Sequence, residues 1–176
     1  LPPDVRPLTR AEGYAVQASL EARTTAPLFG WKIAATSVAG QRHIQVDGPI
    51  AGRLLRERVR AQGDRLSLAH NRMAVAEPEF AFRMGRDLPP RSAPYTVDEV
   101  VSAVASLHPA IEVPNSRFAD FVCAGEAQLI ADNACGHEVI IGDAAPPQWR
   151  DLDLSKQRVV GRVSGAARSY DREGSG

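Results

Sequence analysis

The pattern of apolar and polar residues predicts two clearly bounded helices. Thr9 and Glu12 have the spacing of a capping box, and apolar residues recur at helical spacing after them until a Thr-Thr pair ends the helix. Thr96 and Glu99 repeat that spacing before a second apolar stripe. This stripe comprises Val100, Val101, Val104 and Leu107. A further helix is predicted over residues 124–134.

Strand patterns outnumber these helices. The predicted strands cover residues 30–36, 65–69, 77–84, 109–113, 138–141 and 157–163. Residues 85–95 are rich in proline and predict a long turn, and the basic stretch from Arg53 to Arg65 predicts a solvated helix or loop. Because strands and helices do not alternate regularly, the pattern favours an α+β fold with helices on a curved mixed sheet over a doubly wound parallel sheet.

Composition narrows the class of protein. The 176 residues are 44% apolar and carry 21 basic against 21 acidic side chains, which is typical of a folded domain and not of a disordered chain. Balanced charge argues against a protein that coats nucleic acid or an anionic membrane, and no apolar stretch reaches bilayer length. We therefore expect no nucleic-acid partner and no membrane partner.

The cysteines and the chain ends give two further expectations. Cys123 and Cys135 form neither a disulfide scaffold nor a C-x-x-C motif, so a reducing cytoplasm is the expected location. The chain begins at Leu1 without an initiator Met and ends on the loop-forming residues 172–176, so we expect residues to be missing at both ends. The glycine motifs that bind nucleotides and the G-x-S-x-G motif of serine hydrolases are absent from the sequence.

The triplet Glu77-Pro78-Glu79 is the first candidate for chemistry. Residues two apart on a strand point to the same face, so the two carboxylates converge. Like charges at that separation repel unless a cation lies between them or one is protonated. An acidic outer face is the commoner explanation of such a triplet. Phe80, Phe82 and Met84, however, predict a strand with a buried face.

Glu112 and Lys32 extend this candidate site. Glu112 lies in an otherwise apolar strand and needs a partner, which is either an arginine such as Arg117 or a metal ion. Three carboxylates without a Cys or His cluster favour magnesium or manganese over zinc. Lys32 lies in another apolar strand, where its ammonium must reach an anion unless it extends to solvent. Asp47, beside Gly48-Pro49, has the chemistry of a turn residue.

These motifs, in this order, resemble the hydratase and decarboxylase branch of the fumarylacetoacetate hydrolase superfamily. The matching segments are Gly30–Ser37, Gln45–Gly52, Glu77–Phe82, Asp87–Pro89, Pro94–Thr96, Ala110–Val113, Ser116–Phe118, Ala131–Ala134 and Val139–Gly142. The resemblance extends from the first helix to about Val163, and the order and separations of its motifs are together specific.

The resemblance implies a fold and a set of site residues. It implies a mixed β-roll with outer helices in a single domain over residues 1–176, with a helical segment over about 1–28, a roll over about 29–176 and an incomplete C-terminus. The implied ligands of Mg²⁺ or Mn²⁺ are Glu77, Glu79 and Glu112. Lys32 matches a lysine near the substrate. Asp47 matches an acidic residue of the loop that covers the site, although the following Gly48-Pro49-Ile50 is less acidic than in many hydratases.

The resemblance also implies an activity and partners. The implied substrates are small 2-oxo or 2-hydroxydienoic acids from aromatic catabolism, and a hydro-lyase of this kind adds water to give a 4-hydroxy-2-oxo acid. Relatives are generally oligomeric, so we expect a homo-oligomer. A decarboxylase of the same pathway is a further candidate partner.

Three other functions stay open at this point. Decarboxylation of a 4-oxalocrotonate-type substrate would need a positive group for the second carboxylate, and the sequence does not place one. Carbon–carbon hydrolysis of an acylpyruvate would need a His–Glu pair, whereas the histidines lack metal-ligand spacing and are expected to be structural. They are His43, His70, His108 and His137. A non-catalytic partner of another pathway enzyme is the third alternative.

Overall fold

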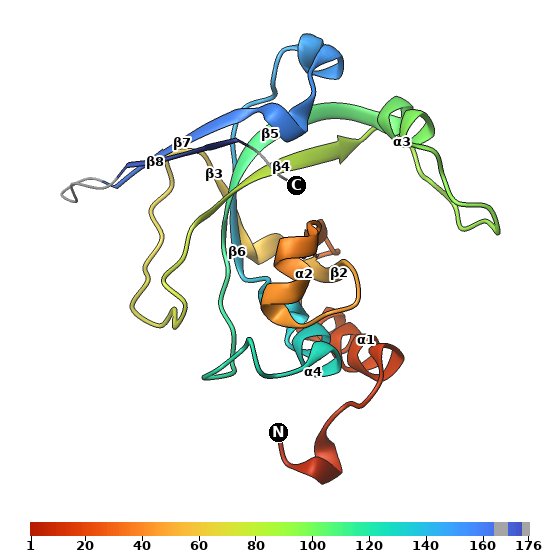
Figure 1. Cartoon of the computed structure of the whole chain (residues 1–176), viewed down its shortest axis with the longest axis vertical. Coiled ribbons are helices and arrows are strands. Elements are labelled where there is room, and N and C mark those ends of the chain that lie inside the picture. Colours follow the sequence, from red (N-terminus) through yellow and green to blue (C-terminus); the bar gives the residue numbers. More distant parts are fainter. Residues whose placement is uncertain (164–168, 174–176) are drawn as a thin grey trace. The chain divides into compact units, whose positions relative to one another are not determined.

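A computed structural model of the chain describes residues 1–163 and 169–173, which form two compact units. One unit contains Leu1–Glu77 and Glu112–Ile140, and the other contains Pro78–Ile111 and Ile141–Gly176. Strands β4 (Glu77–Met84) and β5 (Val104–Val113) lead from one unit to the other along the chain (Figure 1). Each unit is therefore built from two separate stretches of sequence.

The strands fall into three sheets. One sheet of four strands has the order β3-β6-β5-β4, with β3 at Val59–Ala61 and β6 at Glu138–Ile141. The other two sheets are antiparallel pairs, which are β1 (Gly30–Ala34) with β2 (Ile50–Leu54) and β7 (Arg158–Arg162) with β8 (Ser169–Glu173). This mixture of helices and sheets confirms the expected α+β class.

Helices α1 (Arg10–Ala18) and α4 (Glu126–Ala131) pack side by side in the first unit (Figure 1). The capping box predicted at the start of α1 is present, because Glu12 N donates to Thr9 Oγ1 at 3.2 Å and Thr9 N donates to the Glu12 carboxylate at 3.1 Å. A Cβ atom on Gly13 would lie 2.5 Å from the carbonyl oxygen of Ala127. Only glycine therefore allows this close approach of the two helices.

The core of the first unit combines apolar packing with one buried amide. Its buried side chains are Val46, Ile50, Leu129, Ile130, Ala134 and Cys135. Gln17 of α1 is fully buried, and its side-chain amide donates to the carbonyls of Ala51 at 2.9 Å and Ile130 at 2.8 Å. Because a buried amide is stable only when it is hydrogen-bonded, these contacts link α1 to β2 and α4.

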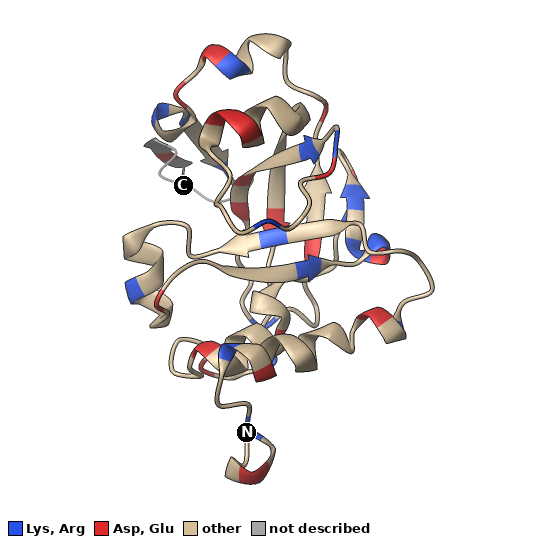
Figure 2. Ribbon diagram, turned by 90° about the vertical axis from the view of Figure 1, so that its right-hand side faces the viewer, with Lys and Arg blue, Asp and Glu red and all other residues tan. Residues whose placement is uncertain are grey.

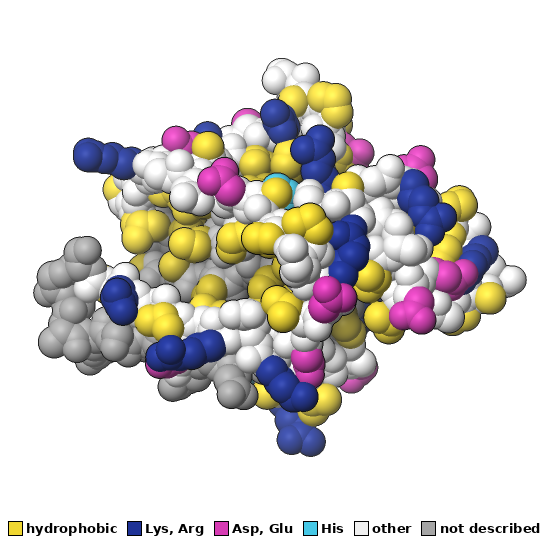
Figure 3. Space-filling model, turned by 90° about the horizontal axis from the view of Figure 1, so that it is seen from above, with side chains coloured by type: hydrophobic (Ala, Val, Ile, Leu, Met, Phe, Trp, Pro, Cys, Tyr) yellow, Lys and Arg dark blue, Asp and Glu magenta, His cyan; other side chains and the backbone are white. Residues whose placement is uncertain are grey.

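The second unit has a smaller core. Val104, Leu107 and Trp149 are its buried residues, and the Phe82 ring lies 5.9 Å from the Trp149 ring. Several apolar side chains of the described residues are exposed, and some of them are visible in yellow in Figure 3. Exposed apolar area of this kind is typical of surfaces that another chain or segment covers. The expected homo-oligomer stays a prediction.

Several predicted elements match the structure and several were wrong. Strands β4 and β6 have the predicted bounds, while β1 and β7 lie within theirs. The strand predicted at 65–69 is irregular, and the basic stretch after Arg53 contains β3. Helix α2 (Val38–Ile44) was missed. The end of the chain contains β8, which includes two residues expected in a loop, while residues 174–176 lie outside the described part.

Two tertiary effects explain further differences. Helix α3 (Val97–Ala103) ends before Val104, because the second half of the predicted apolar stripe belongs to strand β5 and is buried there. Strand β4 was expected to have a buried face, but the side chains of Phe82 and Met84 are 47% and 45% exposed. The sequence pattern identified the strand correctly and its degree of burial incorrectly.

Charge distribution agrees with the composition. Basic and acidic segments are interspersed along the ribbon (Figure 2). None of the helices within residues 1–163 and 169–173 is long and apolar enough to cross a membrane.

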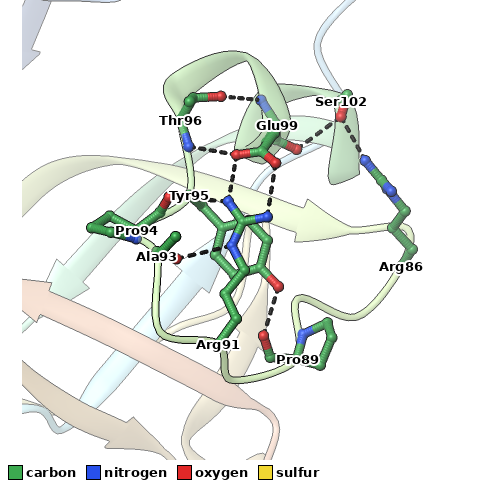
Figure 4. Close-up of polar contacts among 9 residues, drawn as sticks. All are labelled: Arg86, Pro89, Arg91, Ala93, Pro94, Tyr95, Thr96, Glu99 and Ser102. Carbon is green, nitrogen blue, oxygen red and sulfur yellow. Dashed lines mark hydrogen bonds and ion pairs between the residues drawn. The ribbon is translucent and has the colours of Figure 1, made fainter.

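The proline-rich segment before α3 is held by a cluster around Arg91 (Figure 4). The Arg91 guanidinium lies over the Tyr95 ring, 3.7 Å from its centre, and donates to both carboxylate oxygens of Glu99 at 2.9 and 2.6 Å. The same carboxylate accepts the Thr96 N–H in the predicted capping box of α3. Together, the Arg91 guanidinium and this backbone bond lower the pKa of Glu99 to about 2.

We predict that Arg91→Ala returns the pKa of Glu99 toward its ordinary value of 4.5, as measured by NMR titration of the side-chain carboxyl. Because the folded-state pKa lies below the ordinary value, the pair stabilises the fold above about pH 4.5. This contribution disappears as the pH falls toward 2. Arg86→Ala, which removes a hydrogen bond to Ser102 in the same segment, should shift the Glu99 pKa much less. Equal shifts in the two variants would contradict the assignment.

Candidate metal centre

Lys32 lies on the inner face of β1, whereas its apolar neighbours face outward. Trp31 and Ile33 are 50% and 52% exposed, while the Lys32 side chain is only 11% exposed. This arrangement reverses the usual burial of apolar residues. The strand therefore places an ammonium group inside the first unit, where it must have anionic or polar partners.

The Lys32 ammonium has two such partners. Its Nζ atom lies 3.1 Å from Oε2 of Glu112, whose side chain is 5% exposed, and it donates to the carbonyl oxygen of Ala134 at 3.2 Å. The expectation that Lys32 reaches an anion is confirmed. Removing one partner of a buried ion pair destabilises a protein by about 3–5 kcal/mol, because the remaining charge stays buried without compensation.

Two glycines make room for the lysine stem. Gly52 lies opposite Lys32 in the β1–β2 register, and a Cβ there would lie 3.0 Å from Lys32 Cγ and 2.3 Å from the carbonyl oxygen of Asn133. A Cβ on Gly136 would lie 3.4 Å from the same Cγ atom. The lysine therefore runs through a space that side chains at these two positions would narrow or close.

Three carboxylates that the sequence singled out are close together. One oxygen each from Glu77, Glu79 and Glu112 lies within 4.8 Å of the others, and among the described residues this is the group of acidic, His or Cys side chains that could hold a metal ion. Glu77 and Glu79 are two residues apart on β4, and Glu112 is near the end of β5. The convergence predicted from strand geometry is thus present.

The donor set fits a hard divalent cation. Oxygens bound to one ion at 2.0–2.1 Å, the magnesium distance, lie at most about 4.2 Å apart, and at calcium distances at most about 5.2 Å. The observed separations require at most a small closing movement. Three carboxylates and one lysine carry a formal charge of about −2, which a divalent cation would balance. Nitrogen and sulfur ligands, which zinc prefers, are missing from this described group.

An unusual backbone turn supports Lys32. The three consecutive residues Asn133, Ala134 and Cys135 have φ values of 60°, 50° and 60°, the left-handed region that residues other than glycine seldom adopt. Each such residue costs about 1–2 kcal/mol. Strain of this kind persists only where the surrounding structure holds it, and it is concentrated at functional sites. Ala134, in the middle of this turn, provides the carbonyl that accepts from Lys32.

Cys135 is not a candidate nucleophile. Burial, assisted by the nearby Asp132 carboxylate, raises the pKa of its thiol to about 11. The thiol is therefore protonated at neutral pH, and the residue packs as a small apolar side chain.

Arg117 does not serve as the partner of Glu112. Its guanidinium instead forms an ion pair with Asp132 at 2.5 Å, and Asp132 also accepts the hydroxyl of Ser116 at 2.7 Å. Asp132 is a buried residue that connects α4 to the segment after β5. Asp47 lies in the bend before β2 with an exposed side chain, and its role stays a prediction.

Two of the four histidines contact other groups of the described chain, and two line a cavity. His108 bonds to Ser106 and to the Gly142 carbonyl, and His43 packs edge-on against Phe121. His70 and His137 line a cavity of about 660 Å³ in the first unit. The cavity also contains Arg58 and Arg60, both paired with the buried Glu138.

This cavity does not contain the carboxylate group. Val113 is the residue of strand β5 that lines the cavity. Adjacent residues of a strand point to opposite faces. The side chain of Val113 therefore lies on the other side of the strand from Glu112.

Sequence comparisons reveal similar proteins, although no family model matches the chain. The TodF product hydratase of Pseudomonas putida is 33% identical over 133 residues, which are 76% of this chain and 48% of that protein. A 2-keto-4-pentenoate hydratase of Paraburkholderia xenovorans is 34% identical over 73% of this chain and 46% of its own. A 4-oxalocrotonate decarboxylase of a Pseudomonas species is 30% identical over 78% of this chain and 51% of its own length. The chain spans about half the length of the curated relatives that it matches.

Solved structures share the fold. A 4-oxalocrotonate decarboxylase from Pseudomonas putida, complexed with magnesium and adipate, matches 85% of this chain and 56% of its own with a TM-score of 0.71 at 23% identity. The same enzyme complexed with calcium and acetate matches with a TM-score of 0.69. This likeness shows that the chain shares its fold with part of that decarboxylase, while the expected β-roll stays a prediction.

We predict that Gly52→Ala destabilises the protein by about 1–3 kcal/mol or more, because the new Cβ would overlap the Asn133 carbonyl and crowd the Lys32 stem. The free energy of unfolding in urea measures this effect. Gly30→Ala is the matched control, since a Cβ on Gly30, in the same pair of strands, would have no atom within 4 Å. Its stability should change by less than about 0.5 kcal/mol. Comparable losses in both variants would show that the close contact is unimportant.

Proposed function

This chain is a homologue of 2-keto-4-pentenoate hydratases and of a 4-oxalocrotonate decarboxylase, members of the fumarylacetoacetate hydrolase superfamily, and we propose that it forms the metal- and lysine-bearing part of a hydratase. The proposed reaction adds water to a 2-hydroxy-2,4-dienoate, or to its 2-oxo-alkenoate tautomer, to give a 4-hydroxy-2-oxo acid in aromatic catabolism. The cation would be Mg²⁺ or Mn²⁺.

The observation that carries this proposal is the convergence of the three carboxylates with a buried lysine. One carboxylate oxygen from each of Glu77, Glu79 and Glu112 lies within 4.8 Å of the others, and Lys32 Nζ lies 3.1 Å from Glu112 Oε2. Carboxylates at this separation repel one another strongly without a cation. In our proposal these three side chains hold the metal, and Lys32 faces the substrate.

Charge determines what each group contributes. A bound divalent cation would act as a Lewis acid on the 2-oxo group of the substrate. Lys32 offsets the remaining negative charge of the three carboxylates, so an anionic substrate approaches a site with no net repulsion. Its ammonium also stabilises negative charge that develops on the 2-oxo oxygen during tautomerisation.

The water that adds to the distal carbon of the substrate needs a base. Asp47 is our candidate, because it is a carboxylate outside the group of three that we assign to the metal. The assignment rests on the motif resemblance, in which Asp47 matches an acidic residue of the loop that covers the site. In the overall reaction the enol oxygen loses its proton and carbon 5 gains one, the hydroxyl of the water adds to carbon 4, and carbon 3 gains the second proton. Lys32 would donate a hydrogen bond to the 2-oxo oxygen while it carries negative charge.

We predict that Glu77→Gln and Glu79→Gln each weaken Mn²⁺ binding on the order of 100-fold, because each removes one charged oxygen ligand. Isothermal titration calorimetry of the chain with Mn²⁺, alone and with oxalate, measures the loss. Glu57→Gln is a matched control, because Glu57 lies in the same unit as Glu77 and bonds to Thr24, away from this group. Unchanged Mn²⁺ affinity in both ligand variants would end the metal-site proposal.

Decarboxylation is the second candidate function, because a 4-oxalocrotonate decarboxylase is among the relatives and among the structures with the same fold.

We predict that the protein consumes 2-hydroxypenta-2,4-dienoate without release of carbon dioxide, as followed by ultraviolet absorbance and by carbon dioxide detection. Lys32→Met should reduce turnover by a factor of about 100 or more, since it removes the ammonium group that we assign to the negative charge on the 2-oxo oxygen. Carbon dioxide release from 4-oxalocrotonate, with no reaction of the dienoate, would favour the decarboxylase.

A further inference from the structure

The left-handed turn Asn133–Cys135 uses each of its backbone carbonyls. The Asn133 carbonyl accepts the Gly136 N–H at 2.8 Å, the Cys135 carbonyl accepts the Asn115 N–H at 2.8 Å, and the Ala134 carbonyl accepts from Lys32 at 3.2 Å. Two of these three bonds hold the turn within the protein backbone. The middle carbonyl is the one directed at the lysine ammonium.

The side chain of Asn133 holds this turn against β2. Its Oδ1 atom accepts the Arg53 N–H at 2.6 Å, and its Nδ2 atom donates to the Arg53 carbonyl at 2.9 Å and to the Gly136 carbonyl at 3.1 Å. The residue is 4% exposed. Its amide therefore binds both backbone groups of Arg53, the residue that follows Gly52 on the strand opposite Lys32.

The hydrogen bonds of the Asn133 side chain are the surrounding contacts that maintain the strained backbone of the turn. A turn with three positive φ values is maintained only by surrounding contacts. Asparagine tolerates the left-handed region better than most residues, and here its side chain also makes three hydrogen bonds. An asparagine whose only role was to occupy a turn would not require bonds to both backbone groups of another strand.

We infer that Asn133 is a positioning residue for Lys32. Its amide holds the left-handed turn at the backbone of β2, and the turn holds the lysine ammonium through the Ala134 carbonyl, beside Glu112. An ammonium has three N–H donors, and in the described part of the chain two of those of Lys32 are engaged by Glu112 and Ala134. In the proposed function, the third donates to a substrate oxygen. This last step rests on the proposed function, while the positioning itself does not.

The test measures how accessible Lys32 is to trace acetylation by acetic anhydride, with Lys156 as an internal reference. The Lys32 side chain is 11% exposed and the Lys156 side chain 77%, so mass spectrometry should find Lys32 labelled far more slowly. In Asn133→Gly the ratio of Lys32 to Lys156 labelling should rise about tenfold, the effect of losing roughly two hydrogen bonds on a local opening equilibrium. Glycine keeps positive φ accessible, so this variant removes the amide without adding backbone strain.

Asn71→Gly is the matched control. Asn71 belongs to the same unit, and its amide also joins two backbone groups, the Pro114 carbonyl and the Ala74 N–H, without a bond to Lys32. Its labelling ratio should equal that of the wild-type chain. An unchanged ratio in Asn133→Gly, or an equal rise in both variants, would overturn the inference.

A second variant and a second readout complete the test. Asn133→Asp keeps the acceptor for the Arg53 N–H and loses the donors, so its labelling ratio should lie between those of the wild type and Asn133→Gly, even if the glycine variant does not fold. In both Asn133 variants, kcat for the dienoate should fall while KM changes little. If labelling rises as expected and kcat does not fall, the positioning stands and the proposed role of Lys32 is wrong.

Discussion

The buried ion pair between Lys32 and Glu112 is the constraint on which the candidate site depends. Strand β1 turns an ammonium group inward and two hydrophobic side chains outward, which is unfavourable unless the charge is compensated. Glu112 and the Ala134 carbonyl provide that compensation. The same pair places the lysine next to the carboxylate group, so one contact determines both the stability of this region and the chemistry available to it.

Much of the local structure could be predicted from the sequence. The capping boxes at Thr9 and Thr96 are present, because short-range hydrogen bonds determine where such helices begin. The convergence of Glu77 and Glu79 follows from the two-residue period of a strand. The inclusion of Glu112 came from its need for a partner in an apolar strand, and the structure places it with Lys32 and the other two carboxylates.

What could not be predicted depends on contacts between distant parts of the chain. The sequence around Asn133 does not indicate that this residue bonds to Arg53, eighty positions away. Nor does the sequence around Arg117 indicate that it pairs with Asp132 and not with Glu112. Helix α2 has only 7 residues, about two turns, and therefore no apolar stripe long enough to be recognised. Residues 104–107 continue a helical pattern but pair as a strand, since burial in the sheet outweighs local preference. The glycines beside Lys32 show their importance only once the lysine stem has been placed.

The interleaved composition of the two units has a consequence for synthesis. The first unit requires the stretch that ends at Glu77 and the stretch that begins at Glu112, so its early half leaves the ribosome before the segments that complete its core exist. The second unit needs Ile141 and the residues after it in the same way. Neither unit can finish folding as its first half emerges, and during that interval the nascent chain exposes apolar surface for which chaperones are the natural partners.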